Sequence, residues 1–153
     1  MSKVSRLTNP ALKSLKPLVG PWEMEIRWSE ETHKLIGGPL TVRGTVEFEV
    51  IGGGGFLVLR MGADAHWIMG RDDTSRQYRV LYADSRGVSR IYEMSLNGGL
   101  WKMWRKAPGF HQRFTGRFSR NKRMIIARWE KSANGSKWQL DFNVKYTKKP
   151  LKR

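Results

Sequence analysis

Arg90 is the residue whose surroundings point most directly to chemistry. It lies in the run 88–96, where Val88, Arg90, Tyr92 and Met94 share one side of an alternating pattern. A guanidinium on the apolar face of a strand needs an anionic or polar partner, because burying it unpaired is costly. We therefore predict that Arg90 binds a carboxylate or phosphate of a ligand. Pairing with an internal carboxylate, or a bulge that turns Arg90 outward, would also explain the pattern.

Other polar residues are predicted to face the same interior. Tyr78 and Tyr82 alternate inward in 76–83, Gln112 alternates with phenylalanines in 109–119, and His66 stands beside Trp67 at the start of a strand. Sparse polar groups in an apolar wall orient a bound ligand, although tyrosines also pack with the hydroxyl at the rim of a core. The full candidate set is Arg90, Tyr92, Tyr82, Tyr78, Gln112, His66 and Trp28.

The sequence offers no constellation typical of catalysis or metal binding. It lacks a Ser-His-Asp order or a carboxylate pair, and a rim histidine such as His66 is the one candidate base or ligand. Asp72-Asp73 lacks calcium-loop spacing. The glycines 52–55 precede a strand instead of a helix, so they indicate a hairpin turn and no phosphate loop. We predict binding rather than catalysis, without metal.

Strand patterns position these residues. The turns between the strands are short, and Asn97-Gly98-Gly99 is the strongest hairpin signal. An open sheet would leave two exposed edges, so closure is expected. The predicted fold class is all-β, a single antiparallel meander β-barrel of about ten strands with room for one small ligand. The candidate strands are 22–28, 40–50, 56–61, 65–70, 76–83, 88–96, 100–106, 109–119, 123–131 and 136–146.

The remaining segments are expected to close and connect the barrel. A short helix over 9–18 would bury Leu12, Leu15 and Leu18, and a polar loop is predicted between 28 and 40. Trp22 is predicted to plug one end of the barrel. The residues that the alternation of the strands places inward include Val42, Gly44, Trp138 and Leu140.

Composition sets the broad class. The chain has 153 residues and no cysteine, and its 29 Lys and Arg against 13 Asp and Glu give a net charge of +16. The expected organisation is a disordered tail over 1–8, a barrel over 9–147 and a basic tail over 148–153. No apolar run suits a signal peptide or a membrane span, so a cytoplasmic monomer or homodimer is predicted.

The excess of positive charge suggests a second class of function. Bases on the outer strand faces would simply solvate the barrel, but they would also attract nucleic acid or an anionic membrane. The alternative hypothesis is therefore polyanion binding through one basic hairpin, with the candidate residues Arg113, Arg117, Arg120, Lys122, Arg123 and Arg128.

Several short motifs resemble those of a known group of barrels. They are Leu18-Val19-Gly20-x-Trp22, Gly52-Gly53-Gly54-Gly55-Phe56-Leu57, Met69-Gly70-Arg71-Asp72, Asp84-x-x-Gly87 and Trp129-Glu130 with Gly135-x-x-Trp138. From Leu12 to Tyr146 the chain is similar to a bacterial family of uncharacterised lipocalin-like proteins in the calycin superfamily, and more distantly to lipocalins and fatty-acid-binding proteins. The resemblance implies a ligand-binding barrel, with Lys145 or Lys148 packed over Trp22.

The same resemblance raises haem and catalysis as further alternatives. Nitrobindin, a related ten-stranded barrel, holds haem through a histidine near its C-terminal strands. This chain lacks Gly-x-Gly-x-Tyr-Pro after Trp22, and no histidine follows His111, which is predicted to face outward. Haem needs an axial ligand, so no cofactor is predicted. A barrel isomerase or cyclase, with Arg90 and a tyrosine polarising a carbonyl, is the remaining alternative.

Overall fold

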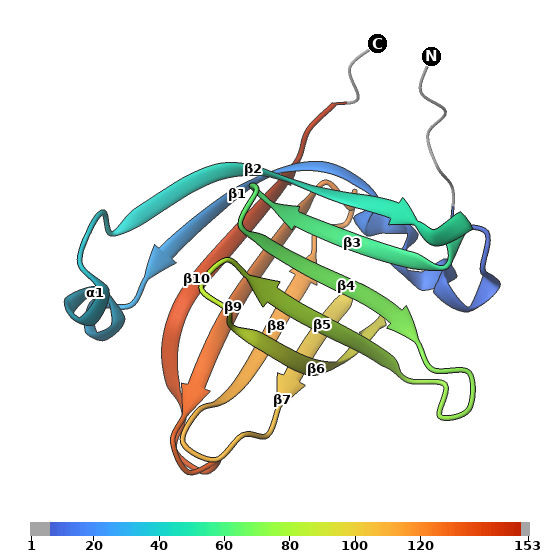
Figure 1. Cartoon of the computed structure of the whole chain (residues 1–153). Helices are drawn as coiled ribbons and strands as arrows, with labels where there is room; N and C mark the ends of the chain where they lie inside the picture. Colours follow the sequence, from blue (N-terminus) through green and yellow to red (C-terminus); the bar gives the residue numbers. More distant parts are fainter. Residues whose placement is uncertain (1–6, 151–153) are drawn as a thin grey trace.

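Ten antiparallel strands close into one barrel (Figure 1). The computed structural model describes residues 7–150, and the strand order around the barrel is β1-β10-β9-β8-β7-β6-β5-β4-β3-β2. Strands that follow one another in the chain are therefore neighbours, and β1 pairs with β10 to remove both edges. The predicted all-β meander barrel is confirmed.

The elements agree closely with the predicted ranges. The helical segments are η1 (Pro10–Leu18), α1 (Glu30–Ile36) and η2 (Gly52–Gly54). The strands are β1 (Gly20–Trp28), β2 (Thr41–Ile51), β3 (Phe56–Met61), β4 (Ala65–Arg71), β5 (Tyr78–Asp84), β6 (Ser89–Asn97), β7 (Leu100–Arg105), β8 (His111–Phe118), β9 (Met124–Ser132) and β10 (Gln139–Lys148).

The helix η1 closes one end of the barrel. It is a 3₁₀ helix, in which residues three apart lie on one side, and Leu12, Leu15 and Leu18 are each fully buried. Asn9 caps its start by accepting a hydrogen bond from the Ala11 backbone N–H at 3.0 Å. The leucine spacing therefore matches the face that this helix buries.

Trp22 plugs this closed end, as predicted. Its side chain is fully buried, and its indole Nε1 donates a hydrogen bond to the Leu18 carbonyl at 2.8 Å. The Lys148 ammonium lies 5.3 Å from the indole centroid, which is a cation–π contact. Trp22 also meets Phe118 and Tyr146 edge-on, so aromatic side chains fill this half of the barrel.

The predicted polar loop between 28 and 40 is partly wrong, because it contains the helix α1. Ser29 caps the helix by accepting a hydrogen bond from the Thr32 backbone N–H at 3.2 Å, and Glu30 and Glu31 follow in the first turn. Gly37 ends it at φ 68°, a left-handed conformation that favours glycine. A capped start, acidic first turn and terminal glycine form a short helix despite the weak apolar pattern.

Four residues predicted to face inward do not, for two reasons. The first half of β2 pairs with β1 alone, since pairing with β3 begins at Glu47, and Val42 and Gly44 are therefore exposed. In β10 the register shifts between Leu140 and Phe142. This bulge buries Asp141 and leaves Leu140 38% exposed, whereas Trp138 stacks on Arg113 of the outer face.

The described part of the chain leaves out most of the two predicted tails. Residues 1–6 and 151–153, which belong to the predicted tails, lie outside the described residues. Lys148, the predicted start of the basic tail, is instead the last residue of β10. Within residues 7–150, no helix has the length and apolar character needed to cross a membrane.

Candidate ligand-binding site

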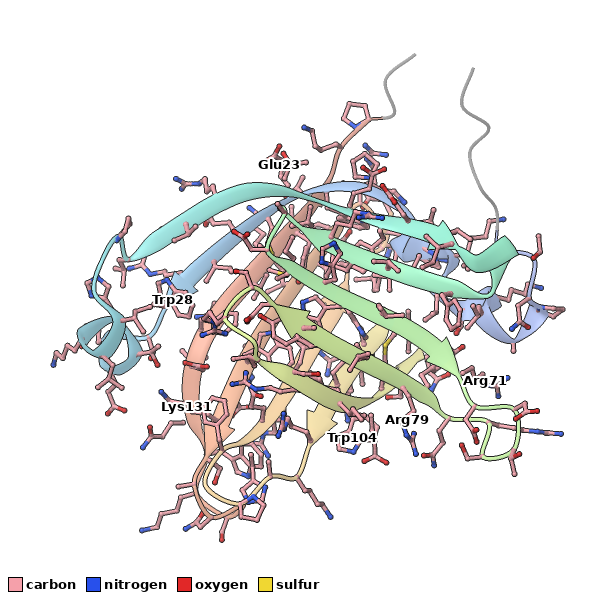
Figure 2. All side chains as sticks on the ribbon, in the orientation of Figure 1. Glu23, Trp28, Arg71, Arg79, Trp104 and Lys131 are labelled. Atoms are coloured by element: carbon pink, nitrogen blue, oxygen red, sulfur yellow. The ribbon has the colours of Figure 1, made fainter. Side chains whose placement is uncertain are left out.

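A pocket of about 410 Å³ opens at the end of the barrel beside α1. We call it the mouth pocket. In Figure 1, α1 and η1 lie on opposite sides of the barrel, and Figure 2 shows Trp28 and Lys131 on the α1 side and Arg71 on the other. Leu35 and Ile36 of α1 form part of its rim, and they are 80% and 55% exposed. The barrel is thus filled at η1 and hollow at α1.

Aromatic side chains form the floor of the mouth pocket. The Trp67 ring lies 5.2 Å from Tyr92 and 5.6 Å from Trp129, measured between centroids. Trp129 in turn lies 6.4 Å from Phe142. These rings come from β4, β6, β9 and β10, and they separate the pocket from the packed core. The floor suits an apolar, and particularly a flat, ligand group.

Above the floor, five neighbouring strands each contribute an inward polar residue. Tyr82 is paired with Arg90, Arg105 with Gln112, and Gln112 with Lys131. Because side chains alternate along a strand, each of these residues lies on the same face as the buried residues two positions away. In β7, Arg105 follows Trp101 and Met103, which are both buried. The result is a polar belt across β5 to β9.

Two guanidinium groups of this belt have no carboxylate partner. Arg105 Nη1 is fully buried and forms no hydrogen bond, and its guanidinium carbon lies 5.8 Å from the Tyr92 ring. The guanidinium carbon of Arg90 lies 5.2 Å from the Phe110 ring. Within residues 7–150, neither arginine forms an ion pair. Arg90 lines the mouth pocket, whereas Arg105 lies next to Tyr92 outside the lining. The pocket therefore carries the charge of Arg90, which the described residues do not neutralise.

Tyr92 lies between these charges and stays neutral. Burial raises the pKa of its hydroxyl, although the nearby Arg90 and Arg105 charges act in the opposite direction. The hydroxyl donates a hydrogen bond to Gln112 Oε1 at 2.6 Å. A neutral tyrosine cannot neutralise a guanidinium, so the charges of Arg90 and Arg105 are not balanced by Tyr92.

The other charged groups of the mouth are neutralised internally. Arg86 Nη2 lies 2.6 Å from Asp84 Oδ2, which also accepts a hydrogen bond from the Tyr82 hydroxyl at 2.6 Å. These bonds hold the pKa of Asp84 well below its usual value, while burial and then Asp84 raise the pKa of Tyr82 to about 12. Lys131 Nζ lies 3.7 Å from Asp141 Oδ1. Arg90 and Arg105, unlike Arg86 and Lys131, have no carboxylate partner among the described residues.

The structure brings most of the predicted site residues together. Arg90, Tyr92, Tyr82, Gln112 and Trp28 line the mouth pocket. Two candidates do not. Tyr78 lies at the other end of the barrel, where its hydroxyl donates to the Ala11 carbonyl at 3.1 Å. His66 points to the outer face, 3.4 Å from Arg60, because Trp67 takes the inward position of that strand.

Histidine ligation of haem does not fit this pocket. The chain has three histidines, and none of them lines it. His33 Nε2 is hydrogen-bonded to the Gly38 carbonyl at 2.7 Å, and His111 Nδ1 accepts from the Ala107 backbone N–H at 3.1 Å. Among the described residues, no group of three His, Cys, Asp or Glu side chains is arranged to hold a metal ion.

The six residues of the predicted basic hairpin are spread along the outer face and the turn of the β8–β9 hairpin. Arg113 and Arg128 lie 3.0 Å and 3.6 Å from Glu130, which neutralises part of their charge. Arg117 lies on the wall of β8. Arg120, Lys122 and Arg123 lie in the turn that joins β8 to β9, near η1. The hairpin spreads its charge along the barrel because both of its strands run the length of the wall.

Comparison with known proteins supports the class of fold alone. No family model matches the chain, and no curated protein matches it in sequence. Its architecture is that of closed, ten-stranded antiparallel barrels. The crystal structure of Rv2717c from M. tuberculosis is similar, with a TM-score of 0.56 and 14% sequence identity over 92% of this chain and 98% of that one. At this identity the likeness concerns the barrel and not its ligand.

Proposed function

We propose that the protein binds a small anionic amphipathic molecule in the mouth pocket. The acid group would contact Arg90, while the charge of Arg105, beside the Tyr92 ring, adds to the positive potential. The apolar body would lie on Trp67 and Trp129. The observation that carries the proposal is the Arg90 guanidinium, which lines the pocket without a carboxylate partner among residues 7–150, whereas Arg86 and Lys131 of the same pocket are paired.

The chemistry of arginine explains why the ligand should be an anion. A guanidinium presents planar N–H donors that match a carboxylate, sulfonate or phosphate, often through two parallel hydrogen bonds. Leaving such a donor buried without an acceptor costs free energy, about 1 to 3 kcal/mol for a polar group and more for a charged one. A bound anion would supply acceptors to Arg90 in a pocket whose floor is apolar, so the charge of the pocket favours this ligand class.

The size and lining of the pocket support the rest of the proposal. A volume of about 410 Å³ falls in the range of small-molecule sites. Aromatic rings form the floor, and Leu35 and Ile36 form part of the rim. The meander barrel and the Lys148 contact over Trp22 also support our placement of the chain among lipocalin-like barrels, whose interiors hold ligands.

Two fluorescent dyes test the proposal, because they differ by one acid group. 8-Anilinonaphthalene-1-sulfonate is an anionic amphipath, and N-phenyl-1-naphthylamine is its counterpart without the sulfonate. We expect the protein to bind the sulfonate dye more tightly. Arg90→Met should weaken binding of the sulfonate dye about tenfold or more, as expected for a hydrogen bond to a charged group, and should leave binding of the neutral dye within about twofold.

Arg79→Met supplies the matched control. Arg79 lies on the outer face of β5, 3.7 Å from Glu93, so its removal lowers the net charge equally without touching the pocket. Its binding of both dyes should equal that of the wild type. Equal loss of sulfonate binding in both variants, or equal affinity of the wild type for the two dyes, would contradict the proposal.

A further inference from the structure

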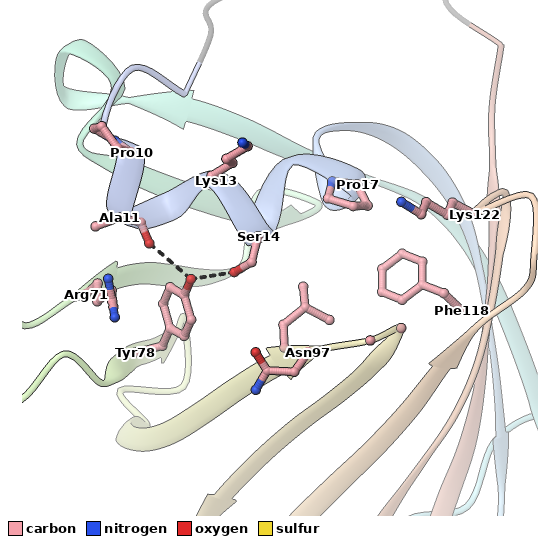
Figure 3. A pocket seen from close by; sticks show the side chains of 13 residues that line it. Pro10, Ala11, Lys13, Ser14, Pro17, Arg71, Tyr78, Asn97, Phe118 and Lys122 are labelled. Atoms are coloured by element: carbon pink, nitrogen blue, oxygen red, sulfur yellow. Dashed lines mark hydrogen bonds between the residues drawn. The ribbon is translucent and has the colours of Figure 1, made fainter.

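A second positively charged site lies at the opposite end of the barrel, along η1. Two adjoining hollows of about 700 Å³ and 430 Å³ share Lys13, Pro17 and Lys122 in their lining. Figure 3 shows the larger hollow, with Lys13 on η1, Lys122 on the turn between β8 and β9, and Arg71 on β4. We call the two hollows together the basic groove. Its cations are Lys13, Lys16, Arg71, Lys122, Arg123 and Lys148.

The basic groove carries charge that is not balanced by the described residues. No aspartate or glutamate lines either hollow, and within residues 7–150 none of the six cations forms an ion pair with a carboxylate. Burial and the charge of Arg123 lower the pKa of Lys148. Four separate elements, η1, β4, the β8–β9 turn and β10, bring these cations together, so the groove is a product of the fold.

The lining of the groove favours an extended phosphate backbone. We propose that the basic groove binds single-stranded nucleic acid. Its two hollows adjoin, as an extended ligand requires, and the partly exposed rings of Tyr78 and Phe118 lie in the larger one. Proteins that bind single strands combine a cationic groove with aromatic rings on which bases stack. The polar side chains of Asn97 and Asn121 complete the lining.

An anionic membrane suits this surface less well. Membrane-surface segments combine basic residues with exposed apolar side chains that enter the lipid. The large apolar side chains that the described residues expose include Leu35, Ile36, Phe110 and Ile91, and none of the exposed ones lines either hollow. The basic groove therefore offers charge and hydrogen bonds without an insertable apolar patch.

Binding of a fluorescein-labelled twelve-nucleotide oligouridylate, measured by anisotropy over a range of KCl concentrations, tests the inference. Release of counterions gives a slope of log affinity against log salt of about −0.7 per phosphate contact. If four of the cations engage phosphates, the slope should be about −3. Lys13→Gln combined with Lys16→Gln should weaken binding at 100 mM KCl about tenfold or more and make the slope about 1.4 less steep.

The matched control is Lys34→Gln combined with Lys102→Gln. Both lysines are exposed, on α1 and on the outer wall of β7, and the charge removed is the same. This variant should bind the oligonucleotide as the wild type does. An equal loss in the two double variants, or no loss in Lys13→Gln/Lys16→Gln, would overturn the inference.

Two competitors separate nucleic acid from other anions. Inorganic triphosphate that displaces the oligonucleotide at equal phosphate concentration would indicate a compact phosphate site and would overturn the inference. The second competitor is vesicles of phosphatidylcholine with phosphatidylserine. If these vesicles bind through Lys13 and Lys16 and the oligonucleotide does not, the groove is a membrane-binding site instead. Weak competition by both is the expected result. None of these outcomes depends on the mouth pocket.

Discussion

Arg105 is in an unfavourable position when no ligand is bound. One of its guanidinium nitrogens is buried without a hydrogen-bond partner, and the nearest aromatic partner, Tyr92, has its ring centroid 5.8 Å away. Residues that bind ligands are often retained at a cost in stability. The position of Arg105 is therefore better explained by its positive charge beside the mouth pocket than by what the barrel needs to fold.

This reasoning predicts that Arg105→Met does not destabilise the ligand-free protein. Replacing a buried unpaired charge with an apolar side chain of similar length should leave the free energy of unfolding unchanged or raise it by about 1 kcal/mol or more. Urea denaturation of the two proteins measures the difference. Arg113→Met, which removes the contacts with Glu130 and Trp138, should instead cost about 1 kcal/mol. A clear loss of stability in Arg105→Met would show that the arginine supports the fold.

Asp84 makes a pH-dependent contribution to stability. Its carboxylate is 6% exposed and accepts hydrogen bonds from Arg86 and Tyr82, which lower its pKa below the ordinary value of 3.8. Between that value and the lower folded one, the unfolded chain binds more protons than the folded chain. The contribution is therefore complete above about pH 5 and is lost as the pH falls below about 4.

Asp84→Asn tests this account. Urea denaturation from pH 7 to pH 2.5 should show the wild type more stable than the variant at neutral pH, with a difference that shrinks as the pH falls below 4. The Asn side chain keeps the shape but has no charge to lose. A difference that stays constant across the range would mean that the ionised carboxylate does not contribute.

For individual residues, the alternation of side chains along each strand made much of the mouth pocket predictable from the sequence. The sequence places Arg90 beside Tyr92 on one strand face, and the barrel keeps them there. Arg105 obeys the same alternation after Trp101 and Met103, so the signal that identifies it is present in the sequence. The prediction that His66 faces the interior at one rim was wrong. His66 and Trp67 are neighbours in the sequence, so only one of them can face inward, and packing inside the barrel decides which.

The short helix α1 is fixed to the mouth by a small polar cluster. Thr32 Oγ1 donates a hydrogen bond to Asp141 Oδ1 at 2.8 Å and accepts one from Lys131 Nζ at 2.9 Å. The Ser29 backbone N–H donates to the Asp141 carbonyl at 2.9 Å. Because Leu35 and Ile36 are largely exposed, these polar contacts, more than apolar packing, hold α1 over the pocket.

Thr32→Val should therefore loosen α1 while leaving the barrel intact. The loss of one buried hydroxyl and its two hydrogen bonds is expected to cost about 1 to 2 kcal/mol locally. Hydrogen exchange of the His33 and Gly37 amides, which bond to carbonyls of Ser29 and His33, should become at least about fivefold faster.

The matched control removes a hydroxyl elsewhere. Thr45 Oγ1 bonds to Glu23 on the outer face of β2 at 3.1 Å, and Thr45→Val should leave exchange in α1 unchanged. Unaltered exchange of His33 and Gly37 in Thr32→Val would mean that the polar cluster does not fix the helix.

Strands were easier to predict than the features that interrupt them. Ten alternating runs separated by short turns specify the barrel. The bulge that buries Asp141 depends on the pairing of β9 with β10, which no local pattern records. The first half of β2 has the right alternation but lacks its second neighbour, so its inward face has nothing to pack against.

Over the whole molecule, one end of the barrel provides stability and the other provides the pocket. Trp22, Trp101 and Phe48 are each at most 1% exposed in the half that η1 closes, whereas the half beside α1 contains the mouth pocket. Trp22→Ala should lower the free energy of unfolding by about 3 to 5 kcal/mol. It should leave the preference for the sulfonate dye over the neutral dye unchanged, provided that the measurement is made where the variant is folded.

Thermal and urea denaturation measure that loss, with Trp104→Ala as the control. Trp104 lies on the outer face of β7, opposite Glu93, and is only partly buried. Its replacement should cost less than half as much. Similar losses in the two variants would contradict the assignment of Trp22 as the plug.

The overall barrel could be predicted because its closure follows from many independent strands, but the distribution of its charge could not. The sequence records a net charge of +16 and suggests one basic hairpin. The fold instead pairs part of that hairpin with Glu130 and joins its turn to lysines of η1 and β10. Such surfaces unite residues more than 100 positions apart, as with Lys13 and Lys148.

A crystal structure of the protein with 8-anilinonaphthalene-1-sulfonate bound at saturation tests the central claim most directly. We predict the sulfonate within hydrogen-bond distance of the Arg90 guanidinium, with the naphthalene ring against Trp67 or Trp129. A dye bound only outside the mouth pocket, or bound there with its sulfonate turned to solvent and away from Arg90, would contradict the claim that Arg90 forms an anion site.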